Sequence, residues 1–126
     1  GEKVLSPPLA YNKVAYFTTY APNFVSTDPC RPGNLGLSRL YALDYLNGGA
    51  VKNYDTSNDT TVNGQTTQVL ADSDRGEELG VGIPSGIVLV FPKTGDARIL
   101  VGSGGGLPGA NTTPGGRFYP LYWLQQ

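Results

Sequence analysis

The sequence predicts an all-β fold with long loops rich in glycine and proline. Three observations lead to this prediction. The 126 residues include 18 glycines and 10 prolines, which is typical of turns between short strands. Apolar residues make up 39% of the chain, enough to bury a modest core rather than stay disordered. Several runs are rich in β-branched and aromatic residues, whereas no segment has helical periodicity beyond about two turns.

The first strands are expected to form a hairpin. Residues 3–6 have the composition of a short strand, which ends at Pro7-Pro8 because proline cannot donate to a ladder. Residues 13–20 are the stronger strand, since β-branched and aromatic side chains dominate them. Asn12-Lys13 has the composition of a turn just before that strand. We therefore expect residues 3–6 and 13–20 to pair.

A long loop precedes the next strand. Residues 21–37 contain three Pro, two Gly and three Asn or Asp without apolar periodicity, which predicts a loop. Residues 38–45 form a predicted strand. It ends at Asn47-Gly48-Gly49, a strong reverse-turn signal, and Ala50-Val51 then begins a return strand.

Polar residues dominate the middle of the chain. Residues 53–66 are predicted to be a second loop, and residues 67–70 a short strand. Residues 72–78 carry paired carboxylates, and glycoside hydrolysis needs only two such groups. A hydrophilic stretch with a glycine favours a solvated loop instead of a catalytic site. The pairs are Asp72 with Asp74 and Glu77 with Glu78.

The most definite hairpin lies near residue 90. Residues 87–91 are an unbroken apolar run, as expected for a strand buried on both faces. Residues 92–96 form the turn and residues 97–102 return. An aromatic strand is expected at 118–123, at a sheet edge because of its proline.

The glycine cluster at 102–109 has two interpretations. A phosphate-binding loop would need a helix directly after it. The following residues include Pro108 and Pro114 and cannot form one. We therefore favour a structural role, in which glycine lets two backbone segments cross closely.

A calcium loop is a second candidate site. Oxygen-bearing side chains alternate at Asp55, Ser57 and Asp59, followed by Asn63, as in the first half of a calcium loop. Thr60 stands where that loop needs glycine, and Thr66 stands where it needs a bidentate Glu. An Asx-rich loop without metal is the favoured interpretation.

Composition excludes several functions. The chain has no histidine, so it holds no Ser-His-Asp or Cys-His nucleophile and no histidine-based zinc site. With a net charge of -1 and no basic stripe, it lacks the electrostatic footprint of nucleic-acid binding. No apolar stretch is long enough to be a membrane span. We predict no catalytic, cofactor-binding or metal-binding residue in this chain.

Cys30 is the single cysteine and cannot form a disulfide within the chain. It is either a free or buried thiol, or it bridges to a cysteine elsewhere in a longer protein. Because the sequence contains no methionine, even at position 1, we expect residues 1–126 to be one β module that is an internal or C-terminal excerpt of such a protein.

Aromatic residues on the predicted strands are either core residues or a platform for sugars or a protein partner. Alternation along strands favours the core. The residues are Tyr16, Phe17, Tyr20, Tyr41, Tyr45, Phe118, Tyr119, Tyr122 and Trp123.

A family resemblance rests on several segments in order. Residues 38–51, Ser-Arg-Leu-Tyr-Ala-Leu-Asp-Tyr-Leu-Asn-Gly-Gly-Ala-Val, are similar to the strand–turn–strand unit of quinoprotein-like β-propeller blades. Together with the other segments, they resemble the extreme C-terminal region of the PilY family of type IV pilus assembly and tip-adhesin proteins. The other segments are residues 1–8, 14–20, 80–86, 101–106 and 121–126.

The resemblance implies a β-propeller domain, export to the periplasm, outer membrane or pilus surface, and roles in pilus assembly, attachment and motility. Its implied partners are pilus subunits, minor pilins, and host or surface ligands. The family also implies calcium in a propeller loop. Asp55, Asp59 and Asn63 do not match the loop pattern, so calcium is expected upstream, in the parent protein.

A propeller blade takes about 40–50 residues, so 126 residues cannot close a ring. We expect mostly antiparallel blade-type sheets, as a partial propeller or a small sandwich-like module. A non-enzymatic pilus module is the preferred function. The alternatives are a fragment of a quinone-dependent dehydrogenase propeller and a carbohydrate-binding module.

Overall fold

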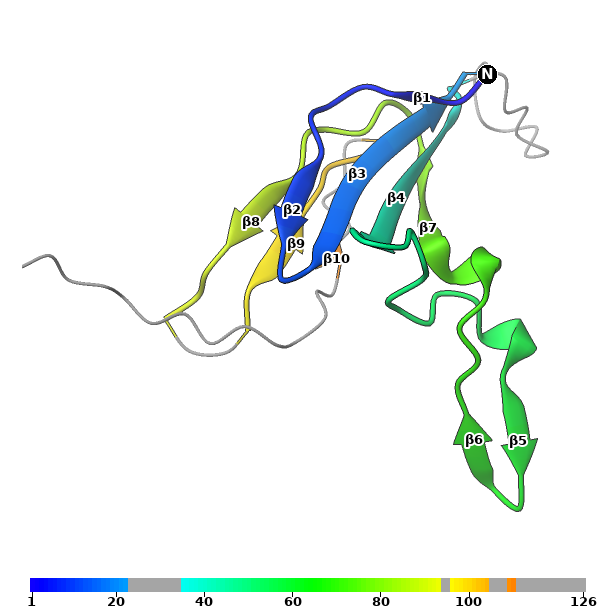
Figure 1. Cartoon of the computed structure of the whole chain (residues 1–126). Coiled ribbons are helices and arrows are strands. Elements are labelled where there is room, and N and C mark those ends of the chain that lie inside the picture. Colours follow the sequence, from blue (N-terminus) through cyan, green and yellow to red (C-terminus); the bar gives the residue numbers. More distant parts are fainter. Residues whose placement is uncertain (23–34, 94–95, 105–108, 111–126) are drawn as a thin grey trace, which may run out of the picture.

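The computed structural model describes residues 1–22, 35–93 and 96–104, and the backbone of 109–110. These residues form a five-stranded sheet, a three-stranded sheet and a separate two-stranded hairpin, all antiparallel (Figure 1). The predicted all-β class is therefore confirmed. Most of the predicted loop at 21–37, including Cys30, and the predicted strand at 118–123 lie outside the described residues.

The five-stranded sheet is built around two long central strands. β3 and β4 pair along their full length, and β7 extends the sheet beyond β4. β1 and β2 both pair with the other side of β3, at its two ends. The strands are β1 (Lys3–Val4), β2 (Leu9–Tyr11), β3 (Val14–Ala21), β4 (Leu37–Asp44) and β7 (Gly76–Val81).

The predicted pairing of residues 3–6 with 13–20 is confirmed, because Lys3 lies opposite Tyr20. The direct hairpin partner of β3, however, is β2, which the sequence patterns did not predict. Asn12 and Lys13 connect β2 to β3 with φ values of 48° and 64°. Two consecutive positive φ angles define the type I′ connection that fits the twist of a two-residue hairpin.

The turn after β4 is present, but its predicted return strand is not. Ala50 forms only an isolated bridge to Leu43. The carboxylate of Asp44 accepts hydrogen bonds from the backbone N–H groups of Leu46, at 2.8 Å, and Asn47, at 3.2 Å. This Asx-type turn brings the chain back to β4, where the N–H of Asp44 donates to the carbonyl oxygen of Gly49 at 2.9 Å.

The prediction of a solvated loop at 72–78 is wrong. A short 3-10 helix, η2 (Asp72–Arg75), leads directly into β7. Ser38 pairs with Gly80 and Arg39 with Glu78, so Leu79 is the extra residue of a β-bulge. Gly80 has a φ of 117°, which favours glycine at the bulge.

The predicted hairpin near residue 90 is confirmed. β8 (Val88–Val90) pairs with β9 (Arg98–Leu100), and β10 (Gly109–Ala110) pairs with the other side of β9. The expected burial of the apolar run on both faces is wrong. Val88 and Val90 are 57% and 38% exposed, because the sheet meets the core with one face only.

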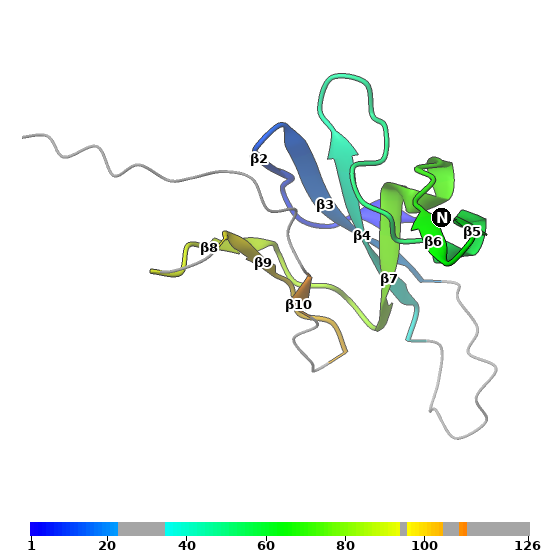
Figure 2. The same cartoon turned by 90° about the horizontal axis from the view of Figure 1, so that it is seen from below.

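The core lies between the two larger sheets, which Figure 2 shows as separate layers. Its buried members come from β3, β4 and β9, so one core joins both sheets. The buried core members are Val14, Tyr16, Leu40, Ala42 and Ile99. Burial of a large apolar side chain such as Leu40 or Ile99 contributes about 1.5–3 kcal/mol to stability.

Two glycines allow the chain to cross itself between the sheets. Gly104 has a φ of 57°, and a Cβ there would lie 2.6 Å from the carbonyl oxygen of Val81. A Cβ on Gly82 would lie 3.2 Å from the Cα of Gly104. The predicted role of the glycine cluster is thus confirmed at Gly104, whereas residues 105–108 lie outside the described part.

The predicted loop at 53–66 contains regular structure. A 3-10 helix, η1 (Thr56–Asn58), is followed by the hairpin of β5 (Thr60–Val62) and β6 (Gln65–Thr67). Of the predicted strand at 67–70, only Thr67 belongs to a strand. Asn63 and Gly64 have φ values of 52° and 77°, again the conformation of a type I′ turn.

Across the described ranges, the structure has no helix long and apolar enough to span a membrane.

Candidate functional site

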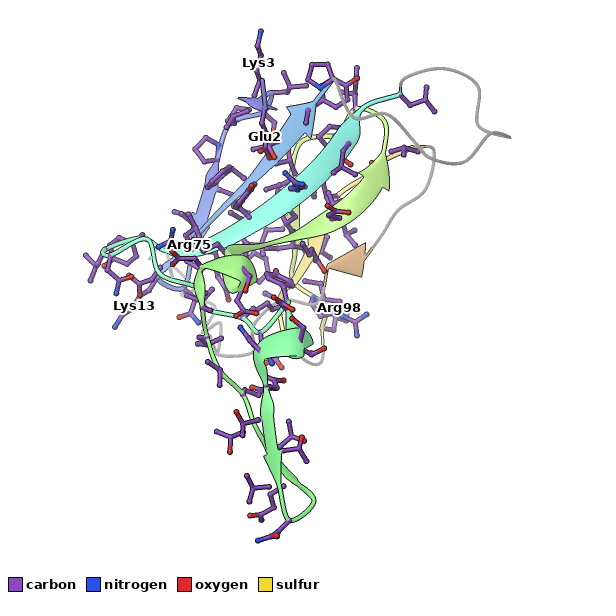
Figure 3. The ribbon with its side chains drawn as sticks, turned by 90° about the vertical axis from the view of Figure 1, so that its right-hand side faces the viewer. Glu2, Lys3, Lys13, Arg75 and Arg98 are labelled. Carbon is purple, nitrogen blue, oxygen red and sulfur yellow. The ribbon has the colours of Figure 1, made fainter. Side chains whose placement is uncertain are left out.

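The β5–β6 hairpin projects from the two-sheet body, as Figure 1 shows at its lower right. We call residues 59–69 the arm, and the two larger sheets the body. Every residue of β5 and β6 is exposed. The side chains stand out on either side of the arm in Figure 3. No residue from 60 to 69 carries a charge, so the arm presents hydroxyl, amide and methyl groups.

A buried carboxylate fixes the base of the arm. The side chain of Asp74, in η2, is fully buried. One of its oxygens accepts from the backbone N–H of Asp55 at 2.7 Å. The other accepts from the N–H of Ala71 at 2.8 Å and from the amide of Asn58 at 3.3 Å. Asp74 thereby ties together the chain that enters the arm and the chain that leaves it.

These donors also set the charge state of Asp74. The N–H groups of Ala71 and Asp55 hold the pKa of the carboxyl below its usual value, although burial opposes them. The carboxylate is therefore ionised at neutral pH. A buried charge that accepts several hydrogen bonds is a strong and directional anchor.

A second carboxylate repeats this arrangement closer to the arm. Asp59 accepts from the side-chain amide of Asn53, at 3.0 and 2.8 Å to its two oxygens. One of those oxygens also accepts from the backbone N–H of Val69 at 3.0 Å. Asp59 and Val69 are the two ends of the arm, so this contact closes its base.

The residues of the calcium pattern are not brought together. Asp55 caps η1, where its carboxylate accepts from the N–H of Ser57 at 3.0 Å. Asp59 faces Asn53 and Val69, and Asn63 lies in the turn at the far end of the arm. Among the described residues, no group of three acidic, His or Cys side chains is placed to hold a metal ion.

The paired carboxylates at 72–78 also diverge. Asp74 points into the base of the arm, whereas Asp72 is exposed and pairs with Arg75 at 3.0 Å. Glu78 lies on the outer face of the sheet, where it contacts Arg39 at 3.2 Å. Glu77 lies beside Leu40 in the ladder and is half-buried. These four groups therefore do not form a two-carboxylate site.

Glu77 belongs to a half-buried cluster at the edge of the core. Burial raises the pKa of Glu77, against the effect of nearby Lys52. Burial lowers the pKa of Lys52, against the effect of Glu77. The Lys52 ammonium lies 5.5 Å from the centre of the Tyr54 ring, within the range of a cation–π contact.

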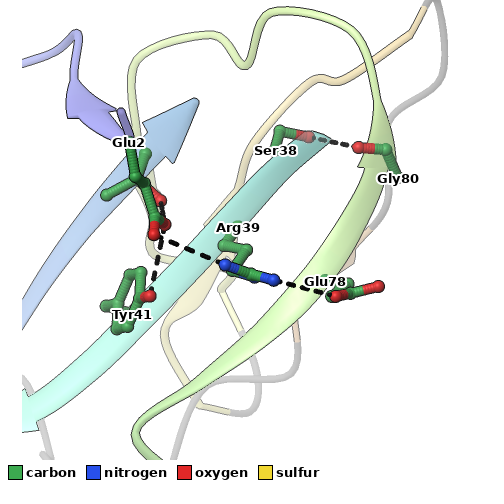
Figure 4. Close-up of polar contacts among 7 residues, drawn as sticks. Glu2, Ser38, Arg39, Tyr41, Glu78 and Gly80 are labelled. Carbon is green, nitrogen blue, oxygen red and sulfur yellow. Dashed lines mark hydrogen bonds and ion pairs between the residues drawn. The ribbon is translucent and has the colours of Figure 1, made fainter. Parts of the chain in front are cut away.

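The outer face of the five-stranded sheet carries a polar network (Figure 4). The carboxylate of Glu2 accepts from the hydroxyls of Thr19 and Tyr41. It also pairs with Arg39 at 3.4 Å, and Arg39 in turn contacts Glu78. This network joins the chain before β1 to β3, β4 and β7. At such exposed sites, ion pairs contribute little stability.

The described aromatic side chains of the predicted set differ in burial, and Tyr45 is 56% exposed. Tyr16 is buried in the core. Phe17 and Tyr41 stack on each other, with ring centres 5.1 Å apart and planes 9° apart. A Cβ on Gly76 would lie 3.0 Å from the Tyr41 ring, so Gly76 makes room for it. Residues 118–123 lie outside the described part.

Sequence reasoning missed the two features that define the candidate site, namely the β5–β6 arm and the buried carboxylate of Asp74. The dipeptide Asn63-Gly64 is the strongest short-range hairpin signal, and it would have revealed the arm. Asp74 gave no such signal, because its role depends on donors up to 19 residues away.

No family model matches this chain, and no curated protein and no solved structure is significantly similar to it.

Proposed function

We propose that this chain is a non-enzymatic β module of a type IV pilus protein related to the PilY family. The observation that carries this proposal is the similarity of the sequence at 38–51 to a propeller-blade unit, in the company of the other family-like segments. The first strand and the turn of that unit form in the structure, and Ala50 adds an isolated bridge to Leu43. The module would act at the pilus or cell surface, after export, in pilus assembly, attachment and motility. Any calcium would be held by the parent protein.

The arm is the contact element in this proposal. Its residues 60–69 are exposed and uncharged, and its base is fixed by Asp59 and Asp74. A contact element held in place before binding loses less conformational entropy when a partner docks. Pilus subunits or minor pilins are the proposed partners, and host or surface ligands would bind through the assembled pilus.

Two glutamate variants in the encoding bacterium test the arm's role. Val62→Glu places a charge on the arm, where Val62 is 60% exposed. Leu46→Glu is the matched control on a turn of the body, where Leu46 is 77% exposed. We expect Val62→Glu to lower surface piliation and attachment several-fold, and Leu46→Glu to leave both unchanged. Sheared surface pili and adherent cells are the measurements.

Deletion of the reading frame tests the function as a whole. The proposal predicts loss of surface pili, attachment and twitching motility. Unchanged piliation and motility would refute it. Loss of a quinone-dependent dehydrogenase activity would support the enzyme-fragment alternative. Glycan binding that Trp123→Ala abolishes would support a carbohydrate-binding module.

A further inference from the structure

The outward face of β8 and β9 is apolar and exposed. Val88 lies opposite Leu100, and Val90 opposite Arg98, so these four side chains form a block on one face of the hairpin. Val88, Val90 and Leu100 are 57%, 38% and 38% exposed. The side chains between them, Leu89 and Ile99, pack toward the core on the other face.

The two outward faces of the body differ in chemistry. The five-stranded sheet carries the polar network of Glu2, Arg39 and Glu78 on its outer face, beside the stacked rings of Phe17 and Tyr41. The three-stranded sheet instead carries the aliphatic side chains of Val88, Val90 and Leu100 on its outward face. Clustered exposed apolar side chains of this kind mark an interaction surface.

The sequence supplies an occupant of matching chemistry close by. β10 ends at Ala110 and pairs with β9, so the chain leaves from the same sheet. Residues 118–124, Phe-Tyr-Pro-Leu-Tyr-Trp-Leu, follow eight positions later and carry no charge. They lie outside the described residues, but their composition and their distance along the chain are known.

The chain between β10 and residue 118 is long enough for the segment 118–124 to reach β8. Eight residues span up to about 26 Å when extended. β8 lies two strands from β10, and neighbouring strands are about 4.8 Å apart. Residues 111–117 include Pro114, Gly115 and Gly116, which suit a change of direction.

We propose that the segment 118–124 docks on the outward face of β8 and β9, with its aromatic side chains against Val88, Val90 and Leu100. The chain thereby covers its own apolar face, independently of any role in a pilus. Arg98 makes no ion pair with the described residues and lies beside Val90, where a guanidinium can rest on an aromatic ring.

A tethered segment is favoured over a second copy of the chain. A short linker holds the segment at an effective concentration of about millimolar or more. Three aliphatic side chains offer far less area than the roughly 1,200 Å² that a stable dimer buries.

Trp123 is the only tryptophan, so its fluorescence reports on the segment directly in the full-length chain. We expect emission at shorter wavelength than N-acetyltryptophanamide, and several-fold weaker quenching by acrylamide. Leu100→Glu should shift emission to longer wavelength and raise quenching several-fold. The matched control is Ile83→Glu, at an apolar residue that is 65% exposed but lies outside β8 and β9, and it should change neither.

Emission and quenching equal to those of N-acetyltryptophanamide in the unaltered chain would overturn the proposal. So would an identical response of the Leu100→Glu and Ile83→Glu variants, both verified as folded by circular dichroism.

A second measurement does not depend on the folding of any charged variant. Tyr122 is replaced by the photoreactive p-benzoylphenylalanine, and cross-links are mapped by mass spectrometry. The proposal predicts cross-links to residues 88–100 within one chain. Cross-links between two chains, or to the outer face of β3 and β4, would overturn it.

Discussion

The body and the arm are ordered by different forces. The body encloses a core in which Leu40 and Ala42 are fully buried, and its backbone crosses itself at Gly82 and Gly104. The arm buries none of the side chains of its strands. Its base is held instead by the hydrogen bonds of Asp59 and Asp74.

This difference explains how a two-stranded hairpin stands away from the body. An isolated hairpin of this kind is marginally stable in water. Apolar burial makes the body cooperative, whereas charge-assisted hydrogen bonds need only fix the two ends of the arm. We therefore expect core substitutions to lower the stability of the body, and substitutions at the base of the arm to release the arm alone.

The largest effect is expected in the core. Leu40→Ala removes a fully buried side chain and should lower the free energy of unfolding by about 3 kcal/mol. Val62→Ala in the arm is the counterpart, and because Val62 is 60% exposed we expect a loss below about 0.5 kcal/mol. Urea denaturation measures both. Equal losses would mean that the arm shares the packing of the body.

The second-largest loss of stability is expected from a substitution at the backbone crossing. Gly104→Ala forces a Cβ to within 2.6 Å of the Val81 carbonyl oxygen at a positive φ, and should cost about 2 kcal/mol or more. Gly48→Ala has a similar φ of 68° but nothing within 4 Å of its Cβ, and should cost about 1 kcal/mol. If thermal unfolding gives the same midpoint for both variants, the close crossing is not a constraint.

A smaller, pH-dependent effect is expected at the edge of the core. Burial raises the pKa of the Tyr54 hydroxyl well above its usual value, and Glu77 and Tyr16 add to the rise. Because the folded-state pKa is the higher one, this contribution to stability is full below about pH 10 and declines as the pH rises further. Tyr54→Phe should therefore flatten the alkaline loss of stability in urea titrations.

The exposed Tyr45, which is 56% accessible, provides the control for this titration. Tyr45→Phe should leave the alkaline loss of stability in place. An unchanged alkaline slope in Tyr54→Phe would contradict the assigned burial.

Local patterns predicted the central part of the fold. The predicted ranges 87–91 and 97–102 contain β8 and β9, and the ranges 13–20 and 38–45 each miss one residue of β3 and β4. These predictions succeed because β-branched and aromatic runs need little context. The glycine cluster also predicted a close crossing, which Gly104 makes. These features depend on residues that are neighbours in the sequence.

The remaining features depend on distant contacts. β2 contains only three residues, too few for a periodic signal, and exists because β3 offers it an edge. The charges at 72–78 indicated a loop, yet β7 pairs there with β4. Asp74 is buried because donors from three separate positions converge on it, and a sequence pattern does not encode such convergence.

Hydrogen exchange of Asp74→Asn tests the separation of arm and body most directly. An Asn side chain can replace only one carboxylate oxygen, and its NH₂ group would face an N–H donor. We predict that exchange in residues 55–71 rises roughly tenfold or more, while β3 and β4 stay protected. Asp72→Asn, at the exposed neighbour, should change neither. Unchanged exchange in the arm, or an equal rise in arm and body, would contradict this account.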